Sequence, residues 1–396
     1  MILMVHTHKL FASMFAVFFL VGSFIIIFNI TPASGLTANS WTTKTSMNQA
    51  RWGLGVVEAE GEIYAIGGCA TNGYVAANER YDPMSDTWTL LTSMPTARSN
   101  FAIAAYQGKI YCIGGETRAE TGIRTVLGLN EVYDTVTDSW STKESLPTSG
   151  TNIHAGTVNG KIYVIVNHDV STFNYSQDLY MYDPATDVWT KKASIPDISS
   201  PGDFNTLTVV GDKIIVTGDH NYDSALNARS DYKVMIYDTK LDQWYVGTSG
   251  SKVAHLGDVG ATKGVNAPQK IYIIGLTSGN DPFVVTNRVY DPTSDTWSTA
   301  KEMATMRKGF GIAVVDDIIY VIGGYTSEDL SLFTTTITPS ALTEQYIPLG
   351  YGGSSDGPVT PSFSPYLIAA VVVIIIAVAA VTLYFYSAKE KKTKTT

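Results

Sequence analysis

Cysteine is nearly absent from this chain. Cys69 and Cys112 are the only two among 396 residues, which excludes a disulfide framework and a cysteine-based zinc site. The chain repeats itself six times, and on that repeat Cys112 aligns with Ala65, four positions before the place of Cys69. We therefore expect the two thiols on neighbouring repeats at different heights, too far apart to pair, and interpret them as small packed side chains.

Charged residues are also scarce. They make up 16% of the chain, against roughly 25% in typical soluble proteins. The formal net charge of −9 leaves no basic surface of the kind that binds nucleic acid. Part of the deficit lies in two long uncharged apolar runs, one near each end of the chain. The sequence therefore predicts no nucleic-acid partner and two segments suited to a membrane.

The first apolar run has the pattern of a secretory signal. Lys9 precedes an apolar run over residues 11–30, and small residues follow at positions 33–35. Residues 1–35 are therefore predicted to be a signal peptide, cleaved between about residues 33 and 38. The run is also long enough to span a bilayer, so an uncleaved signal anchor is the alternative.

The second apolar run predicts a transmembrane helix at residues 366–386, which contain no charge and carry tyrosines at both ends. Lysines crowd the tail at residues 387–396, which favours a cytoplasmic C-terminus. A stalk rich in Gly, Ser and Pro, residues 349–365, separates the helix from the repeats. We expect a single-pass protein of the cell membrane with its repeats outside the cell.

Between these ends, one sequence motif recurs six times at an interval of about 50 residues. Its first copy reads Ile63-Tyr64-Ala65-Ile66-Gly67-Gly68, with Tyr81-Asp82-Pro83 and Asp86-Thr87-Trp88 after it. Each copy shows short alternating apolar strands separated by turn residues, without a long helical periodicity. Four short strands per unit predict an all-β propeller of six blades over residues 38–348.

The chain resembles the kelch-repeat β-propeller proteins. Paired glycines, which let the chain bend and approach a neighbour closely, recur together with a tyrosine and a tryptophan expected to fill the wedge between blades. The third, fourth and fifth repeats lack a full glycine pair. The residues that carry the resemblance are Gly67, Gly68, Tyr81, Trp88, Gly114, Gly115, Tyr133, Trp140, Tyr182, Trp189, Tyr237, Trp244, Tyr290, Trp297, Gly323 and Gly324.

The sixth repeat lacks a tryptophan strand of its own. Residues 344–347 supply its third strand, whereas Trp41 stands alone before the first repeat. We predict that residues 40–44 form the outer strand of blade 6. This would close the ring, tie the two ends of the propeller together and remove exposed sheet edges.

Ligand binding is expected on the face that carries the long connections after the second strand of each repeat. Arg51, Arg98 and Arg307 share one position in repeats one, two and six, so they are predicted to be neighbours at the mouth. Such a basic arc could hold a carboxylate, a sulfate or an anionic sugar. In the alternative, structural interpretation, each arginine donates to backbone carbonyls of the neighbouring blade. The further ligand-binding candidates are Asp203, His255 and Asp258.

No nucleophile, phosphate-loop or dinucleotide pattern accompanies these residues, and no cofactor or metal is predicted. His168 and His220 fall in loops of adjacent blades and permit a metal site, but solvated polar loops are the simpler interpretation. We expect a non-catalytic module that binds an extracellular protein or glycan. Because some kelch-like propellers are copper oxidases or sialic acid isomerases, a membrane-tethered carbohydrate-active enzyme is the alternative, and a structural surface component is a third.

Overall fold

The computed structural model describes residues 36–118, 122–150, 152–167, 177–196, 206–223, 228–251, 256–277, 284–327 and 337–352. The predicted signal peptide, transmembrane helix and cytoplasmic tail lie outside these residues, and so does the stalk beyond residue 352. Over the described ranges, no helix is long and apolar enough to cross a membrane.

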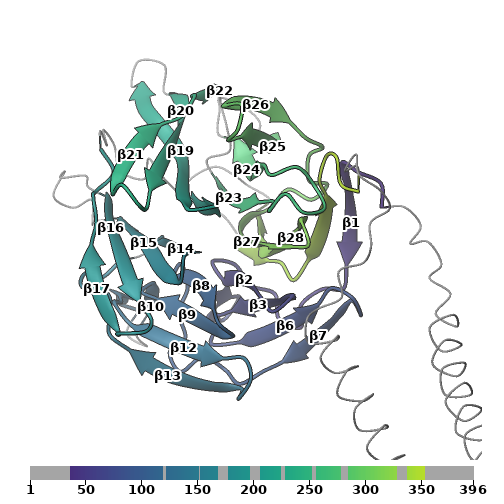
Figure 1. The fold of residues 1–396 in the computed structure, drawn as a ribbon. Coiled ribbons are helices and arrows are strands. Elements are labelled where there is room, and N and C mark those ends of the chain that lie inside the picture. The colour runs from purple at the N-terminus through teal and green to yellow at the C-terminus, as the bar shows by residue number, and fades with distance from the viewer. Residues whose placement is uncertain are drawn as a thin grey trace, which may run out of the picture. The chain divides into compact units, whose positions relative to one another are not determined.

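Six antiparallel sheets radiate around a common axis, which confirms the predicted six-bladed propeller (Figure 1). Each blade runs from an inner strand at the axis to an outer strand at the rim. Blades 1 to 3 are β2 (Gly55–Ala59), β3 (Glu62–Ile66), β6 (Asn78–Asp82), β7 (Thr87–Leu90); β8 (Ala102–Tyr106), β9 (Lys109–Ile113), β12 (Asn130–Asp134), β13 (Ser139–Lys143); and β14 (His154–Val158), β15 (Lys161–Asn167), β16 (Gln177–Asp183), β17 (Val188–Lys191).

The second half of the ring follows the same plan. Blades 4 to 6 are β18 (Thr206–Val210), β19 (Lys213–Asp223), β20 (Ala228–Asp238), β21 (Gln243–Val246); β23 (Leu256–Ala261), β24 (Ile271–Thr277), β25 (Val284–Asp291), β26 (Thr296–Thr299); and β27 (Lys308–Val315), β28 (Ile318–Ser327), β30 (Thr343–Ile347), β1 (Ser40–Lys44). The smaller strands are β4 (Cys69–Ala70), β5 (Gly73–Tyr74), β10 (Glu116–Arg118), β11 (Arg124–Val126), β22 (Gly250–Ser251) and β29 (Ile337–Pro339).

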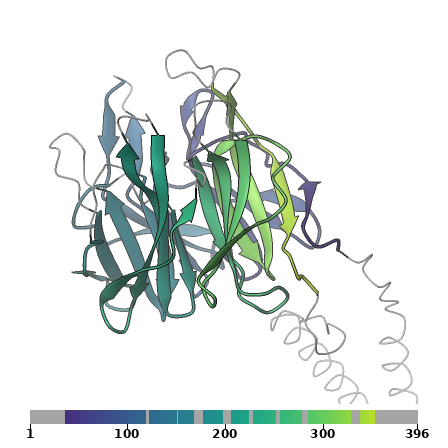
Figure 2. The same cartoon turned by 90° about the horizontal axis from the view of Figure 1, so that it is seen from above.

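The two faces of the propeller differ. One, here called the loop face, carries the connections from second to third strands and the segments that cross from one blade to the next. The other, the turn face, carries the remaining tight turns. One of the long connections after a second strand, residues 116–129, contains the hairpin β10–β11, and β19 pairs with β20 out to Asp223 and Ala228. Figure 2 shows these strand extensions above one face of the blades.

A repeated latch joins neighbouring blades near the rim. In blade 3, the Tyr182 hydroxyl donates to Asp187 Oδ1 at 2.6 Å, and Asp187 also accepts the backbone N–H of Glu144 at 2.9 Å. The indole of Trp189 donates to the carbonyl of Glu144 at 2.9 Å. Asp187 has a φ of 58°, and the equivalent aspartates of blades 1, 2, 4 and 5 share this left-handed conformation, which Asp tolerates better than most residues. The equivalent tyrosine–aspartate pairs are Tyr81–Asp86, Tyr133–Asp138, Tyr237–Asp242 and Tyr290–Asp295.

Blade 6 completes this latch with residues from the start of the propeller. All five residues of β1 pair with β30, from Ser40 opposite Ile347 to Lys44 opposite Thr343. The Trp41 indole donates to the carbonyl of Lys301 at 2.8 Å. The predicted closure of the ring by residues 40–44 is therefore confirmed. Because Ser40 and Ile347 are partners, the chain enters and leaves the propeller at the turn face.

The apolar core lies between the sheets. One isoleucine of the second strand has no exposed surface in any blade, and the tyrosine of each latch is at most 1% exposed; these isoleucines are Ile63, Ile110, Ile162, Ile214, Ile271 and Ile319. Both cysteines are free thiols: Cys112 is buried in β9, and Cys69 is half-buried in β4.

Candidate functional site

The three arginines predicted to form a basic arc are buried. Arg51, Arg98 and Arg307 have no exposed surface. The guanidinium of Arg98 forms an ion pair with Glu131 on β12 and donates from Nη2 to the carbonyl of Cys112 on β9 at 2.8 Å. Each arginine thereby fastens its crossing segment to the second and third strands of its own blade. The equivalent ion pairs are Arg51–Glu79 and Arg307–Glu344.

The expected basic arc is therefore not present at the surface, and the guanidinium groups of these arginines have a structural role. The carbonyls to which they donate belong to their own blade and not, as expected, to the neighbouring one. Burial lowers the pKa of Arg51, an effect that the neighbouring Glu79 carboxylate opposes. The backbone of Arg98 has a second role, because its carbonyl accepts the N–H of Gly68 from blade 1 at 2.9 Å. The carbonyl of Arg51 likewise accepts the N–H of Gly324 from blade 6 at 2.9 Å. These two arginine positions thus link their own blades to the glycine pair of the blade before.

The glutamate partners were missed by reasoning from the sequence, yet a signal for them exists. Glu79, Glu131 and Glu344 occupy one position, two residues before the latch tyrosine, in the same three repeats that carry the arginines. In blades 3, 4 and 5 that position holds Tyr180, Met235 and Arg288 instead. Because arginine and glutamate occur together or not at all, their distribution among the repeats indicates direct contact.

Asp258 also differs from its predicted role as a ligand-binding residue. It lies on inner strand β23, where its Oδ2 accepts the backbone N–H of Ile312 from blade 6 at 3.0 Å and its Oδ1 accepts the N–H of Val259 at 2.8 Å. It therefore joins two blades at the axis, where inner strands have backbone groups that no further strand can pair. Burial raises the pKa of Asp258 to about 6. Asp203 and His255, the remaining candidates, lie outside the described residues, as does His168.

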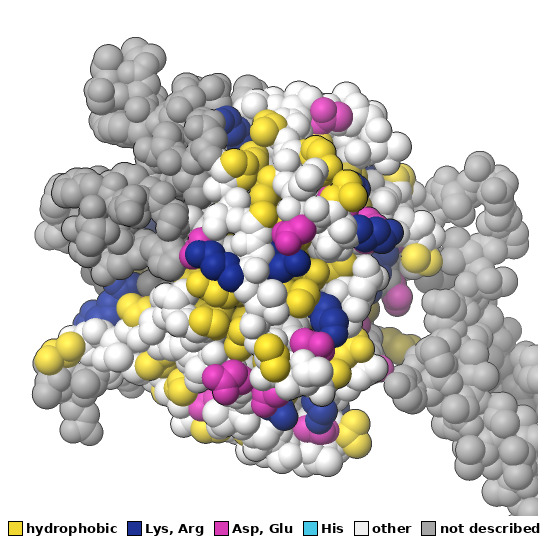
Figure 3. All heavy atoms as spheres, turned by 60° about the vertical axis from the view of Figure 1, so that its left-hand side comes forward, with side chains coloured by type: hydrophobic (Ala, Val, Ile, Leu, Met, Phe, Trp, Pro, Cys, Tyr) yellow, Lys and Arg dark blue, Asp and Glu magenta, His cyan; other side chains and the backbone are white. Residues whose placement is uncertain are grey.

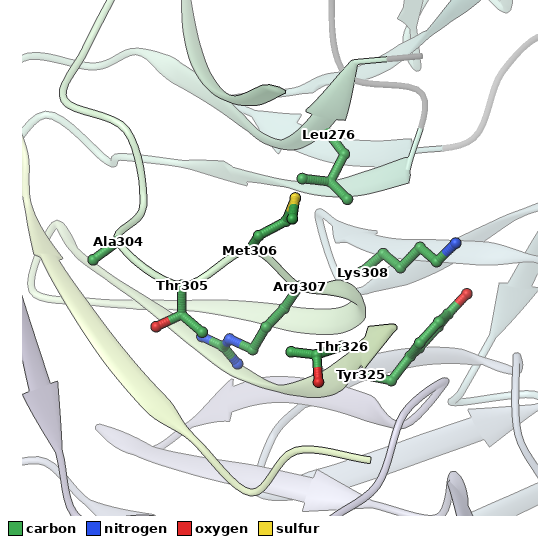
Figure 4. A pocket seen from close by; sticks show the side chains of 8 residues that line it. All are labelled: Leu276, Ala304, Thr305, Met306, Arg307, Lys308, Tyr325 and Thr326. Atoms are coloured by element: carbon green, nitrogen blue, oxygen red, sulfur yellow. The ribbon is translucent and has the colours of Figure 1, made fainter. Parts of the chain in front are cut away.

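A pocket opens on the loop face between blades 5 and 6. It has a volume of about 360 Å³. Its lining comes from the segment that crosses from β26 to β27, from the end of β24 and from the extension of β28 beyond the glycine pair. Figure 4 shows the eight lining residues, which are Leu276, Ala304, Thr305, Met306, Arg307, Lys308, Tyr325 and Thr326.

At the rim of this pocket, a lysine ammonium group lies over an aromatic ring. The Lys308 ammonium lies 5.1 Å from the centre of the Tyr325 ring, within the range of a cation–π contact. Tyr325 in turn meets Trp52 edge to face, with ring centroids 5.3 Å apart. The described lining combines apolar side chains with hydroxyl groups and two cations, so it offers contacts for binding.

A second pocket of about 520 Å³ flanks the same crossing segment on its rim side, lined by residues 286–288 and 299–303. Figure 3 shows the rim on the side of blades 3 and 4, where acidic and basic side chains alternate over short distances. Among the described residues, no group of three or more His, Cys, Asp or Glu side chains is arranged to hold a metal ion.

Comparison with known proteins agrees with this architecture. Residues 23–282 match the family model described as the Attractin/LZTR1 beta-propeller. The chain belongs to this family. Within this Attractin/LZTR1-type propeller, residues 306–337 also match the Kelch motif, which confirms the resemblance to kelch-repeat proteins.

Several curated relatives share part of this propeller. Kelch-like protein 36 of Bos taurus is 30% identical over 190 residues, which cover 46% of this chain and 29% of the relative. Kelch-like protein terF of Aspergillus terreus is 28% identical over 201 residues, which cover 48% of this chain and 42% of the relative. The chain thus spans less than half the length of these relatives.

One solved structure, described as "Structure of YjhT", covers 75% of this chain and 95% of its own with a TM-score of 0.58. Its sequence identity to this chain is 15%. At that identity, the likeness concerns the fold alone.

Proposed function

We propose that this protein is a propeller that binds a protein partner through its loop face on the outside of the cell. The observation that carries the proposal is the pocket between blades 5 and 6, with its apolar lining and its rim of Lys308 and Tyr325. Propellers offer rigid scaffolds whose loops carry binding residues.

The path of the chain supports an orientation. Ser40 and Ile347 are strand partners, and the N–H of Asn39 donates to the carbonyl of Ile347 at 2.8 Å. The predicted signal and the predicted stalk are therefore continuous with the turn face. An anchor attached there leaves the loop face pointing away from the membrane. On this proposal, the partner is a soluble protein or a protein of an opposing surface.

A crosslinking experiment tests the binding face. A photoreactive amino acid is placed at Thr326 on the loop face or at Met84, which is 94% exposed on the turn face, in the full chain on cells of its source organism. We expect a discrete crosslinked species from position 326 and none from position 84. Equal crosslinking from both positions, or none from position 326, contradicts the proposal.

The extracellular placement has its own test. A membrane-impermeant amine reagent applied to intact cells should label the propeller, for example at the exposed Lys240, whose side chain is 71% accessible. Labelling that appears only after the cells are opened overturns the placement outside the cell.

A further inference from the structure

Three apolar side chains project from the turn face. Among the described residues, the three most exposed large apolar side chains are Met84 at 94%, Val136 at 88% and Val265 at 69%, here called the turn tips. Met84 and Val136 occupy the same position in the turns between the third and fourth strands of blades 1 and 2, and Val265 lies in the turn between β23 and β24 of blade 5. Single exposed apolar residues are common, but these three share one face. Because blades 2 and 5 lie on opposite sides of the axis (Figure 1), the turn tips are spread across that face.

The turns that carry these side chains are held in place by aspartates. In each turn, the backbone N–H of the apolar residue donates to an aspartate carboxylate. The pairs and their donor–acceptor distances are Met84–Asp82 at 2.8 Å, Val136–Asp134 at 3.0 Å and Val265–Asp317 at 2.6 Å. A backbone donor without a partner is costly in an apolar medium. The turn tips can therefore leave water with their N–H groups already paired.

The chain leaves the propeller beside one of these turns. The N–H of Gly352 donates to the carbonyl of Asn266, the residue after Val265, at 2.8 Å. In Figure 2 the last described residues, drawn in yellow-green, run toward the edge opposite the strand extensions. Residues 353–365 then separate Gly352 from the predicted transmembrane helix at residue 366, and this length of chain reaches at most about 50 Å. The turn face is therefore the face that such an anchor would keep near the bilayer.

We propose that the turn face rests on the membrane surface, with the side chains of Met84, Val136 and Val265 inserted among the lipids. The inference rests on the proposed placement at the outside of the membrane. A short tether keeps the turn face at a high effective concentration beside the lipid, so three weakly inserting side chains suffice. A lipid surface fits better than a second copy of the chain, because a protein interface needs a packed apolar centre. The turn tips lie on separate blades, and a fluid lipid layer accommodates separate side chains.

Contact with lipid can be measured at each turn tip. The full chain is reconstituted into phosphatidylcholine vesicles that carry a spin label on the acyl chains, and a fluorophore is attached to a cysteine placed at one tip position. Cys69→Ala removes the half-buried native thiol, whereas Cys112 is buried. Ile123, which is 66% exposed on the loop face, gives a matched control on the same tether. We expect the spin label to quench the fluorophore at least about twofold more strongly at the turn tips than at position 123.

A charge substitution separates insertion from mere proximity. Met84→Glu combined with Val136→Glu leaves the tether unchanged, and because both side chains are exposed, the melting temperature should not change. A fluorophore at position 265 should then be quenched at least about twofold less, since a carboxylate among acyl chains is unfavourable. Ile123→Glu is the control and should leave the quenching at position 265 unchanged. Equal quenching at position 265 in the double variant and the parent overturns the insertion.

The remaining outcomes distinguish this inference from the proposed function. If the chain floats with the vesicles but its quenching at positions 84 and 123 is equal, the membrane placement stands and only the lipid contact is wrong. A chain that does not float with the vesicles overturns the anchor and, with it, this inference. If the parent is a dimer in detergent and the double glutamate variant a monomer, the turn face is an interface between copies, and the assignment to lipid is wrong.

Discussion

Tyr346 and Asn39 lie 307 residues apart in the chain, and the tyrosine hydroxyl donates a hydrogen bond to the asparagine Oδ1 at 2.9 Å. This pair is the latch of blade 6, equivalent to the five tyrosine–aspartate pairs of the other blades. Asn39 also accepts the N–H of Lys301 at 2.7 Å, as each aspartate does from its neighbouring blade. In blade 6, the third and fourth strands come from opposite ends of the propeller sequence, so no turn connects them. Strand pairing and the Tyr346–Asn39 hydrogen bond hold them together instead.

The closure predicts a large effect of substitution at Trp41. Its ring lies 4.9 Å from that of Tyr346, and its indole N–H bonds to Lys301. Trp41→Ala should lower the free energy of unfolding by about 3 kcal/mol, since it removes most of this contact. Trp41→Phe keeps an aromatic ring at this position and should cost about 1 kcal/mol for the hydrogen bond. Thermal and urea denaturation of the purified chain measure both, and an unchanged melting temperature for Trp41→Ala contradicts the closure.

The buried ion pairs predict strong destabilisation when one partner is removed. Glu131→Leu leaves the guanidinium of Arg98 buried without its counter-charge, which should cost about 3–5 kcal/mol. Adding Arg98→Met to that variant should recover part of the loss, because two apolar side chains replace two charges. The exposed pair of Lys240 and Asp212 is the control, and Lys240→Met should leave the denaturation curve unchanged. A single variant as stable as the parent would refute the structural role of the arginine.

The glycine pair predicts a contrast between two alanine substitutions. Gly67 has a φ of 61°, and a Cβ there would lie 2.7 Å from the carbonyl oxygen of Arg98. Gly61 has a φ of 81° and open space around its Cβ position. Gly61→Ala should therefore cost only the backbone strain, about 1 kcal/mol, whereas Gly67→Ala adds a clash between blades and should cost roughly 3 kcal/mol. Equal losses in urea denaturation would show that the close approach is unimportant.

Repetition explains why so much of the fold could be predicted. Each blade repeats the same spacing of apolar, glycine and aromatic residues. Where one repeat is ambiguous, its strands can be assigned by alignment with the other repeats. The unmatched Trp41 revealed the closure, because only the sixth repeat lacked its outer strand. Neither inference depends on contacts between individual side chains.

The candidate site was harder to predict because each repeat departs from the common pattern in its own way. The spacing placed Arg51, Arg98 and Arg307 correctly in their repeats, but solvent exposure depends on partners such as Glu131 that come from another strand. The turn between the first and second strands of blade 5, residues 262–270, is longer than its equivalents. The common spacing of the repeats therefore did not place Asp258 on the inner strand. Lys308 and Tyr325 are cross-strand partners of β27 and β28, and Trp52–Cys69 and Ser99–Glu116 pair at the same positions of blades 1 and 2. The pairing is repeated, but the side chains at it differ from repeat to repeat, so the repeat pattern did not predict this contact.

His154 and Asp258 predict opposite dependences of stability on pH. They occupy the same position on the inner strands of blades 3 and 5. Each lies opposite the isoleucine three residues after the first isoleucine of the second strand, Ile165 and Ile274 respectively. Burial lowers the pKa of His154 from 6.5 to about 4 and raises that of Asp258 from 3.8 to about 6. Between these values the folded state binds fewer protons than the unfolded state at His154, and more at Asp258.

The contributions of the two groups to stability therefore have opposite signs. The contribution of His154 increases as the pH rises from about 4 to 6.5, whereas that of Asp258 decreases over nearly the same window, so the two largely cancel in the parent protein. Asp258→Asn removes the opposing contribution, so only the pH dependence of His154 remains. The variant should therefore gain stability relative to the parent as the pH rises from 4.5 to 6.5. His154→Asn should show the reverse. Each difference should reach at most about 3 kcal/mol across the window, measured by urea denaturation at several pH values. Because the exposed aspartates are common to all three proteins, their titration drops out of the differences, and variants whose curves run parallel to that of the parent would contradict the assignment.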